Sequence, residues 1–132
     1  MDLTESLRVA LQTLPQVRLA VLFGSLARGN AGVDSDADVA VIVVPNSATN
    51  RADVEVALGR VAQRGIDLID LTVATPLVRF EIARDGVVLC ERLPNLWADF
   101  RAHAMIDWWD WGYTAARAQG VAISRLRRQS EG

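Results

Sequence analysis

One apolar run constrains the fold more than any other part of the sequence. Residues from Ala37 to Val44 are almost all apolar, most of them are β-branched, and Pro45 ends the run. A strand that is apolar at nearly every position is typical of one buried on both faces of a sheet. The run therefore predicts a buried central strand, yet two acidic residues, Asp36 and Asp38, stand at its start.

Helical and strand patterns alternate along the rest of the chain. They predict helices over about residues 3–14, 51–64, 76–84 and 94–119, a helical turn from Ser25, and strands at about 17–23, 66–71 and 87–90. The length of 132 residues suits a single core. We therefore expect one α/β (α+β) domain over residues 1–132, with a small mixed β-sheet flanked by helices. Its core spans about 3–92, and a C-terminal helix and tail span about 94–132. The tail after Gly120 is expected to be either helical or disordered.

The composition limits the chemistry that the chain can perform. All 14 basic residues are Arg, so there is no Lys for a Schiff base or for the phosphate-binding position of a P-loop. The single Cys90 and single His103 exclude an internal disulfide and a His/Cys metal cage. The chain has 11 Asp, and carboxylates suit hard cations such as magnesium. Metal or acid–base chemistry is therefore expected to depend on carboxylates.

Charge and hydropathy suggest the surroundings of the protein. The formal net charge of −2 disfavours direct binding to nucleic acid. The first twelve residues include acidic and basic side chains and lack the apolar core of a signal peptide, and no apolar run approaches the length of a membrane span. We expect a cytoplasmic protein without a membrane partner.

Three short motifs meet at one end of the predicted sheet. Gly24 and Ser25 follow the first strand, whereas Asp36 and Asp38 begin the second, so they meet only if these strands are antiparallel. The segment between them is also short for a parallel crossover. Asp67 begins the third strand and joins the same end if that strand runs parallel to the second, across the intervening helix. A mixed sheet with one charged end follows.

The two residues of the Asp36–Asp38 pair and a third carboxylate are candidate metal ligands. Side chains two apart on a strand share a face, so Asp36 and Asp38 can hold one ion between them. Asp70 is the rival to Asp67 as the third carboxylate. An odd offset places Asp70 on the opposite face, about 10 Å further along the strand. Asp67 is preferred, and Asp70 stays open.

The ordered motifs resemble the nucleotidyltransferase superfamily that includes DNA polymerase β. They read Gly24-Ser25-Leu-Ala-Arg-Gly29, Ser35-Asp36-Ala-Asp38 and Ile66-Asp67-Leu68. The short length and the run Asp67-Leu-Ile-Asp70-Leu are most similar to the minimal nucleotidyltransferases, in particular the MntA-type antitoxins. The resemblance covers about residues 17–90 and implies the nucleotidyltransferase fold.

The resemblance also implies an activity and roles for the motif residues. The activity is transfer of AMP from ATP to a hydroxyl, with pyrophosphate leaving. Asp36 and Asp38 would bind one or two magnesium ions. Asp67 would bind a second metal or draw the proton from the acceptor hydroxyl.

The phosphates of ATP would be held by the first motif. By the same resemblance, Ser25 and the backbone N–H groups around Gly24 would bind the triphosphate. Arg28 would steady a phosphate in place of the absent Lys.

The C-terminal helix carries more aromatic residues than one buried stripe needs. Trp108 and Trp111 share one face with Phe100, while Trp109 lies on the neighbouring face about 100° away, so one face could bind a partner. The alternative is a broad helix buried in the core of the domain itself. The resemblance implies a HEPN-domain ribonuclease toxin as partner, with a tyrosine as acceptor. Two other functions remain open: nucleotide transfer to a small hydroxylated molecule, and an inactive antitoxin that neutralises its toxin by binding.

Overall fold

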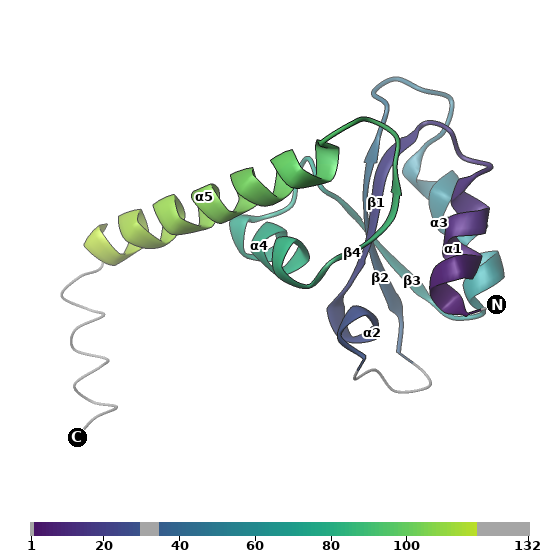
Figure 1. Ribbon diagram of the computed structural model, residues 1–132, viewed down its shortest axis with the longest axis horizontal. Coiled ribbons are helices and arrows are strands. Elements are labelled where there is room, and N and C mark those ends of the chain that lie inside the picture. The colour runs from purple at the N-terminus through teal and green to yellow at the C-terminus, as the bar shows by residue number, and fades with distance from the viewer. Residues whose placement is uncertain (1, 30–34, 119–132) are drawn as a thin grey trace.

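The structure, a computed structural model, describes residues 2–29 and 35–118. Within these residues, helices and strands alternate around a four-stranded sheet (Figure 1). The elements are α1 (Leu3–Leu11), β1 (Val17–Phe23), α2 (Gly24–Arg28), β2 (Ala37–Val43), α3 (Arg51–Ala62), β3 (Ile66–Asp70), α4 (Pro76–Asp85), β4 (Val87–Glu91) and α5 (Leu96–Ala118). The predicted α/β class with a small sheet flanked by helices is confirmed.

The strand order is β3-β2-β1-β4, so the apolar run forms one of the two inner strands, as predicted. Strand β1 pairs antiparallel with β2 and with β4, whereas β2 and β3 are parallel. The mixed topology inferred from the motif positions is therefore confirmed. In the register of the sheet, Asp38 faces Phe23 of β1 on one side and Asp67 of β3 on the other.

Helices cover both faces of the sheet (Figure 1). Helices α1 and α3 pack on one face around a buried apolar cluster that includes Leu7, Leu11 and Leu58. Helices α4 and α5 pack on the other face around a cluster that includes Ile82 and Phe100. Alternate residues of β1 contribute to the two clusters, which is the period of two expected for a strand buried on both faces.

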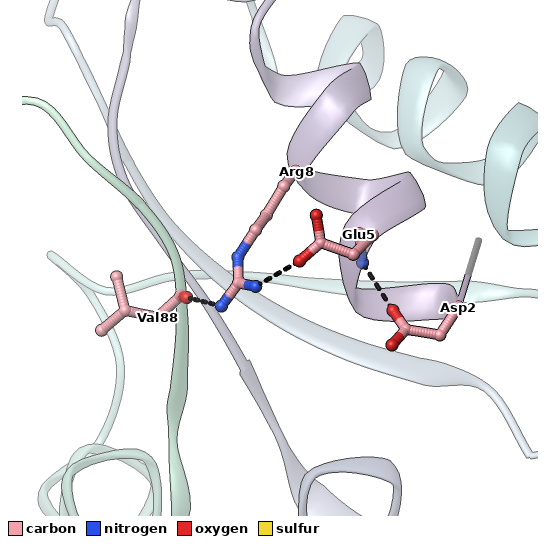
Figure 2. Close-up of polar contacts among 4 residues, drawn as sticks. All are labelled: Asp2, Glu5, Arg8 and Val88. Atoms are coloured by element: carbon pink, nitrogen blue, oxygen red, sulfur yellow. Dashed lines mark hydrogen bonds and ion pairs between the residues drawn. The ribbon is translucent and has the colours of Figure 1, made fainter.

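Capping side chains fix where three helices begin. Asp2 accepts a hydrogen bond of 2.8 Å from the backbone N–H of Glu5 at the start of α1 (Figure 2). Asn50 and Asp53 form a reciprocal capping box at α3, with both hydrogen bonds at 3.0 Å. At α4, Thr75 caps the helix and Pro76 occupies its first turn, as the sequence predicts.

Several predicted boundaries are wrong by a few residues. Helix α1 ends at Leu11 and not at residue 14, because the backbone N–H groups of residues 12 to 14 form turns through bonds three residues back. Helix α3 ends at Ala62 because Gln63, with φ of 53°, adopts the left-handed conformation two residues before Gly65. Helix α5 starts at Leu96, two residues later than predicted. The predicted tail after Gly120 lies outside the described residues.

An arginine from the helix layer reaches a backbone carbonyl on each outer strand. Arg8 of α1 donates a hydrogen bond of 3.0 Å to the carbonyl of Val88 on β4 and pairs with Glu5 at 2.8 Å (Figure 2). On the opposite edge, Arg51 of α3 donates to the carbonyl of Leu68 on β3. These contacts anchor α1 and α3 to the two edges of the sheet.

None of the helices in the described part of the chain is long and apolar enough to cross a membrane.

Candidate active site

A pocket of about 350 Å³ lies at the end of the sheet where the three motifs meet. Figure 1 shows α2 at this end, directly after β1 and beside the start of β2. Helix α4 contributes a further wall. The lining residues are Phe23, Gly24, Ser25, Arg28, Asp38, Asp67, Ile69, Glu81 and Asp85.

Gly24 allows the first motif to approach the second. Its φ is +75°, a conformation that L-residues rarely adopt, and a Cβ built on it would collide with Oδ2 of Asp38. The residue that precedes α2, Phe23, provides no side-chain hydrogen bond to its first turn. The backbone of the Gly24-Ser25 turn therefore lies against a carboxylate, at the wall of the pocket.

Asp38 and Asp67 lie side by side on the two parallel strands. The pKa of Asp38 is raised above its usual range, first by burial and then by the charge of Asp67 and a hydrogen bond to it. The charge of Asp36 adds to this effect, whereas Arg28 opposes it. Two carboxylates forced together in a partly buried site favour a shared proton or a bound cation.

This donor set fits a hard divalent cation, since carboxylate oxygens are the ligands that magnesium prefers. The fold supplies a pair and not a preformed cage: among residues 2–29 and 35–118, no three His, Cys, Asp or Glu side chains come together at metal-binding distances. The predicted ligands thus differ in how closely the structure brings them together.

Asp36 is the predicted site residue that lies off the pocket wall. It precedes β2, and its Oδ1 lies so close to Gly65 that a Cβ there would collide with it. The carbonyl of Gly65 accepts a hydrogen bond of 2.9 Å from the N–H of Ala37, which fixes the start of the strand. In this structure Asp36 affects the pocket through its negative charge, which helps to raise the pKa of Asp38.

Asp70, the rival third carboxylate, has a structural partner away from the pocket. Its Oδ1 accepts hydrogen bonds from the N–H and the hydroxyl of Thr72, at 2.9 and 2.7 Å. It pairs with Val41 in the sheet, three positions along β3 from Asp67. The carboxylate of Asp70 therefore stabilises the turn that follows β3, in the manner of an Asx turn.

Sequence reasoning missed the acidic wall formed by α4. Glu81 and Asp85, four residues apart on one face of the helix, both line the pocket. Nη1 of Arg28 lies 3.6 Å from Oδ2 of Asp85. The pKa of Asp85 is lowered, mainly by a hydrogen bond from Arg84 and to a lesser degree by Arg28. The i, i+4 spacing was a readable signal, but the sequence does not tell which face of α4 turns toward the third strand.

The aromatic residues of α5 divide between packing and exposure. Trp108 is half-buried and stacks on Phe80 of α4 at 5.0 Å and on Trp111 at 5.3 Å between ring centroids. Trp109 is 75% exposed, Ile106 is 56% exposed and Trp111 is 52% exposed. Of the adjacent pair, Trp108 therefore packs within the domain, and Trp109 faces outward on a helix that extends past the sheet (Figure 1).

Comparison with known proteins identifies relatives of this chain and of its fold. A family model described as polymerase beta, nucleotidyltransferase matches residues 5–95. The protein adenylyltransferase MntA of Aphanizomenon flos-aquae (strain 2012/KM1/D3) is 30% identical over 113 residues, which cover 77% of this chain and 75% of that protein.

Two solved structures share the fold. A crystal structure of a toxin–antitoxin with AMP-PNP superposes with a TM-score of 0.69 at 20% identity, covering 94% of this chain and 98% of that chain. A chain from the structure of a tri-AMPylated Shewanella oneidensis HEPN toxin in complex with an MNT antitoxin superposes with a TM-score of 0.62 at 18% identity. The match covers 94% of this chain and 98% of that chain. The likeness extends over nearly the whole of each chain.

Proposed function

We propose that this chain transfers AMP from ATP to a tyrosine of a HEPN ribonuclease toxin and so acts as an antitoxin. The premise is that the chain belongs to the polymerase beta nucleotidyltransferase family and is therefore a nucleotidyltransferase. The observation that carries this proposal is the Asp38–Asp67 pair on the wall of the pocket. Its MntA relative is a protein adenylyltransferase, and a structural neighbour is bound to an AMPylated HEPN toxin.

Asp38 and Asp67, with Asp36 reoriented toward them, would hold magnesium in this pocket. The ion would neutralise charge on the phosphates during the displacement. Two features of the chain support this assignment. The raised pKa of Asp38 marks a carboxylate whose negative charge the protein alone does not compensate. Gly24 lets that carboxylate approach the turn where the phosphates would lie.

The triphosphate would lie against the Gly24-Ser25 turn. The first turn of α2 has no side-chain cap, so its N–H groups and the Ser25 hydroxyl can donate hydrogen bonds to phosphate oxygens. Arg28, at the last turn of the same short helix, lines the pocket and brings a guanidinium to the phosphates. These donors would orient the α-phosphorus toward the acceptor.

The transfer step requires a base for the acceptor hydroxyl. The hydroxyl oxygen bonds to the α-phosphorus, the bond from that phosphorus to the pyrophosphate oxygen breaks, and the proton passes to a carboxylate. Asp67 takes this role in our proposal, because it lies on the outer of the two strands beside Asp38 and lines the open pocket. Pyrophosphate leaves with the electron pair of the broken bond.

The toxin would bind through the exposed aromatic side chains of α5. Trp109 presents a large apolar surface to solvent, and tryptophan is a frequent anchor of protein interfaces. Ile106, one turn earlier on the same face of the helix, extends this exposed apolar surface, whereas Trp111 lies on the face of Trp108.

The proposal is tested by incubating the protein with labelled ATP, magnesium and the HEPN toxin. We expect label on a toxin tyrosine, and none when Asp36→Ala and Asp38→Ala are combined. Label that appears equally with the double variant contradicts the assignment of these carboxylates. Absence of label in all samples contradicts AMP transfer to the toxin.

Two further measurements separate the alternative functions. Release of pyrophosphate with small hydroxylated acceptors, but not with the toxin, would favour a small-molecule transferase. Suppression of toxicity that survives the double Asp variant but is lost with Trp109→Ala would favour neutralisation by binding alone.

A further inference from the structure

Arg28 is held at the wall of the pocket by a residue of a different helix. Arg28 ends α2 and Asp85 ends α4, and the two helices are in contact. The ion pair joins Nη1 of Arg28 to Oδ2 of Asp85 at 3.6 Å. The Asp85 side chain is 17% exposed, whereas that of Arg28 is 45% exposed. The carboxylate is thus the more buried partner of the pair.

Asp85 is itself held in place from its other side. Nε of Arg84 donates to Oδ1 of Asp85 at 3.1 Å, and Nη2 donates to Oδ2 at 2.8 Å. The guanidinium of Arg84 in turn lies over the ring of Phe80, 5.6 Å from its centroid. This bidentate contact restricts the orientation of the Asp85 carboxylate, whose Oδ2 lies toward Arg28.

We propose that Asp85 is a positioning residue for Arg28, holding the guanidinium over the pocket so that its remaining donors point at the triphosphate. This inference rests on the proposed function of the pocket. The contact uses one terminal nitrogen of Arg28, and the guanidinium fork carries five N–H donors. At 3.6 Å the pair is an electrostatic contact longer than a hydrogen bond, which leaves Arg28 able to adjust to a phosphate.

Charge alone predicts the opposite effect of Asp85. The carboxylate lines a pocket that also contains Asp38, Asp67 and Glu81, and each of these negative charges repels a triphosphate. If Asp85 contributed only its charge, its removal would strengthen the binding of ATP. If it positions Arg28, its removal weakens binding or slows turnover, and does so only while Arg28 is present.

A double-mutant cycle with Arg28→Gln and Asp85→Asn separates these effects. The measured quantities are kcat and KM for ATP in AMP transfer, the Kd of magnesium–ATP by titration calorimetry, and the Tm of each variant. We expect kcat/KM to fall about 100-fold for Arg28→Gln and about 10-fold for Asp85→Asn. The double variant should match Arg28→Gln to within about twofold.

Glu55→Gln is the matched control, because it removes the same charge from an exposed position on α3, in the other helix layer. It should leave kcat/KM unchanged. If Asp85→Asn does not fold, Asp85→Glu replaces it in the cycle, since it moves the carboxylate by one methylene but keeps the charge. Its loss of kcat/KM should likewise vanish in the Arg28→Gln background.

The results distinguish this inference from the proposed function. A wild-type protein that transfers AMP but gives a cycle in which the two losses multiply overturns the positioning role alone. So does an increase of kcat/KM on removal of Asp85. A wild-type protein that neither binds magnesium–ATP nor transfers AMP overturns the proposed function, and the positioning role with it.

Discussion

The two faces of the sheet are covered by helices of different character. On the α1/α3 face, the helices bury an aliphatic cluster in which Leu7, Leu11 and Leu58 are fully inaccessible to solvent. On the α4/α5 face, guanidinium groups lie over aromatic rings. The three pairs are Arg79 with Phe100 at 5.4 Å, Arg84 with Phe80 at 5.6 Å, and Arg101 with Trp97 at 5.8 Å.

The two faces also differ in what they contribute to the pocket. Helix α4 supplies Glu81 and Asp85 to its lining, whereas neither α1 nor α3 supplies any lining residue. Helix α5 packs on α4 through Trp108 and exposes Trp109. Both faces therefore bury apolar side chains against the sheet, but only the α4/α5 face also connects the pocket to an exposed aromatic surface. Substitutions on the two faces should separate in the same way.

The largest loss of stability is expected from Leu58→Ala on the α1/α3 face. Leu58 is fully buried, and truncation of such a side chain leaves a cavity that costs about 2–5 kcal/mol of the free energy of unfolding. Urea denaturation measures this loss. Val56→Ala on the same helix is the control, because Val56 is 55% exposed and should change stability by less than about 0.5 kcal/mol. Equal losses would show that this face does not depend on burial.

Gly24→Ala should cost about 1–3 kcal/mol from its positive φ and weaken nucleotide binding in addition. Its Cβ would displace Asp38. Gly29→Ala separates the two effects, because Gly29 also has a positive φ, of 77°, but open space around its Cβ position. Both variants should lose stability in thermal unfolding. Only Gly24→Ala should also raise the Kd of magnesium–ATP. Equal Kd values for the two variants would contradict the importance of the approach to Asp38.

The α4/α5 face should show a division between the two adjacent tryptophans. Trp108→Ala removes two ring contacts, each worth about 1 kcal/mol, and should lower the free energy of unfolding. Trp109→Ala should leave stability unchanged but weaken toxin binding by about 2 kcal/mol, as expected for an interface anchor. Urea denaturation measures the change in the free energy of unfolding, and binding to surface-immobilised toxin measures the change in affinity. Unchanged toxin affinity in Trp109→Ala would remove α5 from the interface.

The smallest predicted effect concerns the charge of Asp38. Because its pKa is raised by folding, the native state binds a proton more tightly than the unfolded state. The free energy of unfolding therefore falls as pH rises from about 3.9, the ordinary value of an Asp carboxyl, through the raised pKa.

Asp38→Asn should accordingly raise the Tm of the metal-free protein at pH 7 and have no such effect below pH of about 3. Magnesium should raise the Tm of the wild type more than that of the variant. Glu55→Gln serves as the charge control. A wild type more stable than Asp38→Asn at pH 7 without metal would contradict the raised pKa.

Much of this arrangement could be predicted from the sequence. The β-branched run from Ala37 predicted the inner strand, and the order of the Gly24-Ser25, Asp36–Asp38 and Asp67 motifs predicted antiparallel and parallel pairing correctly. These inferences work because strand periodicity and chain connectivity are local properties.

Other features depend on packing that the sequence does not specify. The contribution of Asp85 depends on the rotation of α4 against the sheet, and the conformation of Asp36 on its approach to Gly65. Asp70 was a rival ligand in the sequence because its hydrogen bonds could not be predicted. They come from Thr72, in a turn that forms only where β3 ends. Helix ends shifted where a turn or a left-handed residue such as Gln63 competed with the apolar pattern.

AMP transfer by Asp67→Asn and Asp70→Asn, measured side by side, tests the central claim that the Asp38–Asp67 pair performs the chemistry. Both changes replace a carboxylate with an amide on the same strand. The account predicts that Asp67→Asn abolishes labelling of the toxin. Asp70→Asn should retain labelling, because an amide oxygen still accepts the hydrogen bonds from Thr72. Labelling retained by Asp67→Asn and lost by a stably folded Asp70→Asn would contradict it.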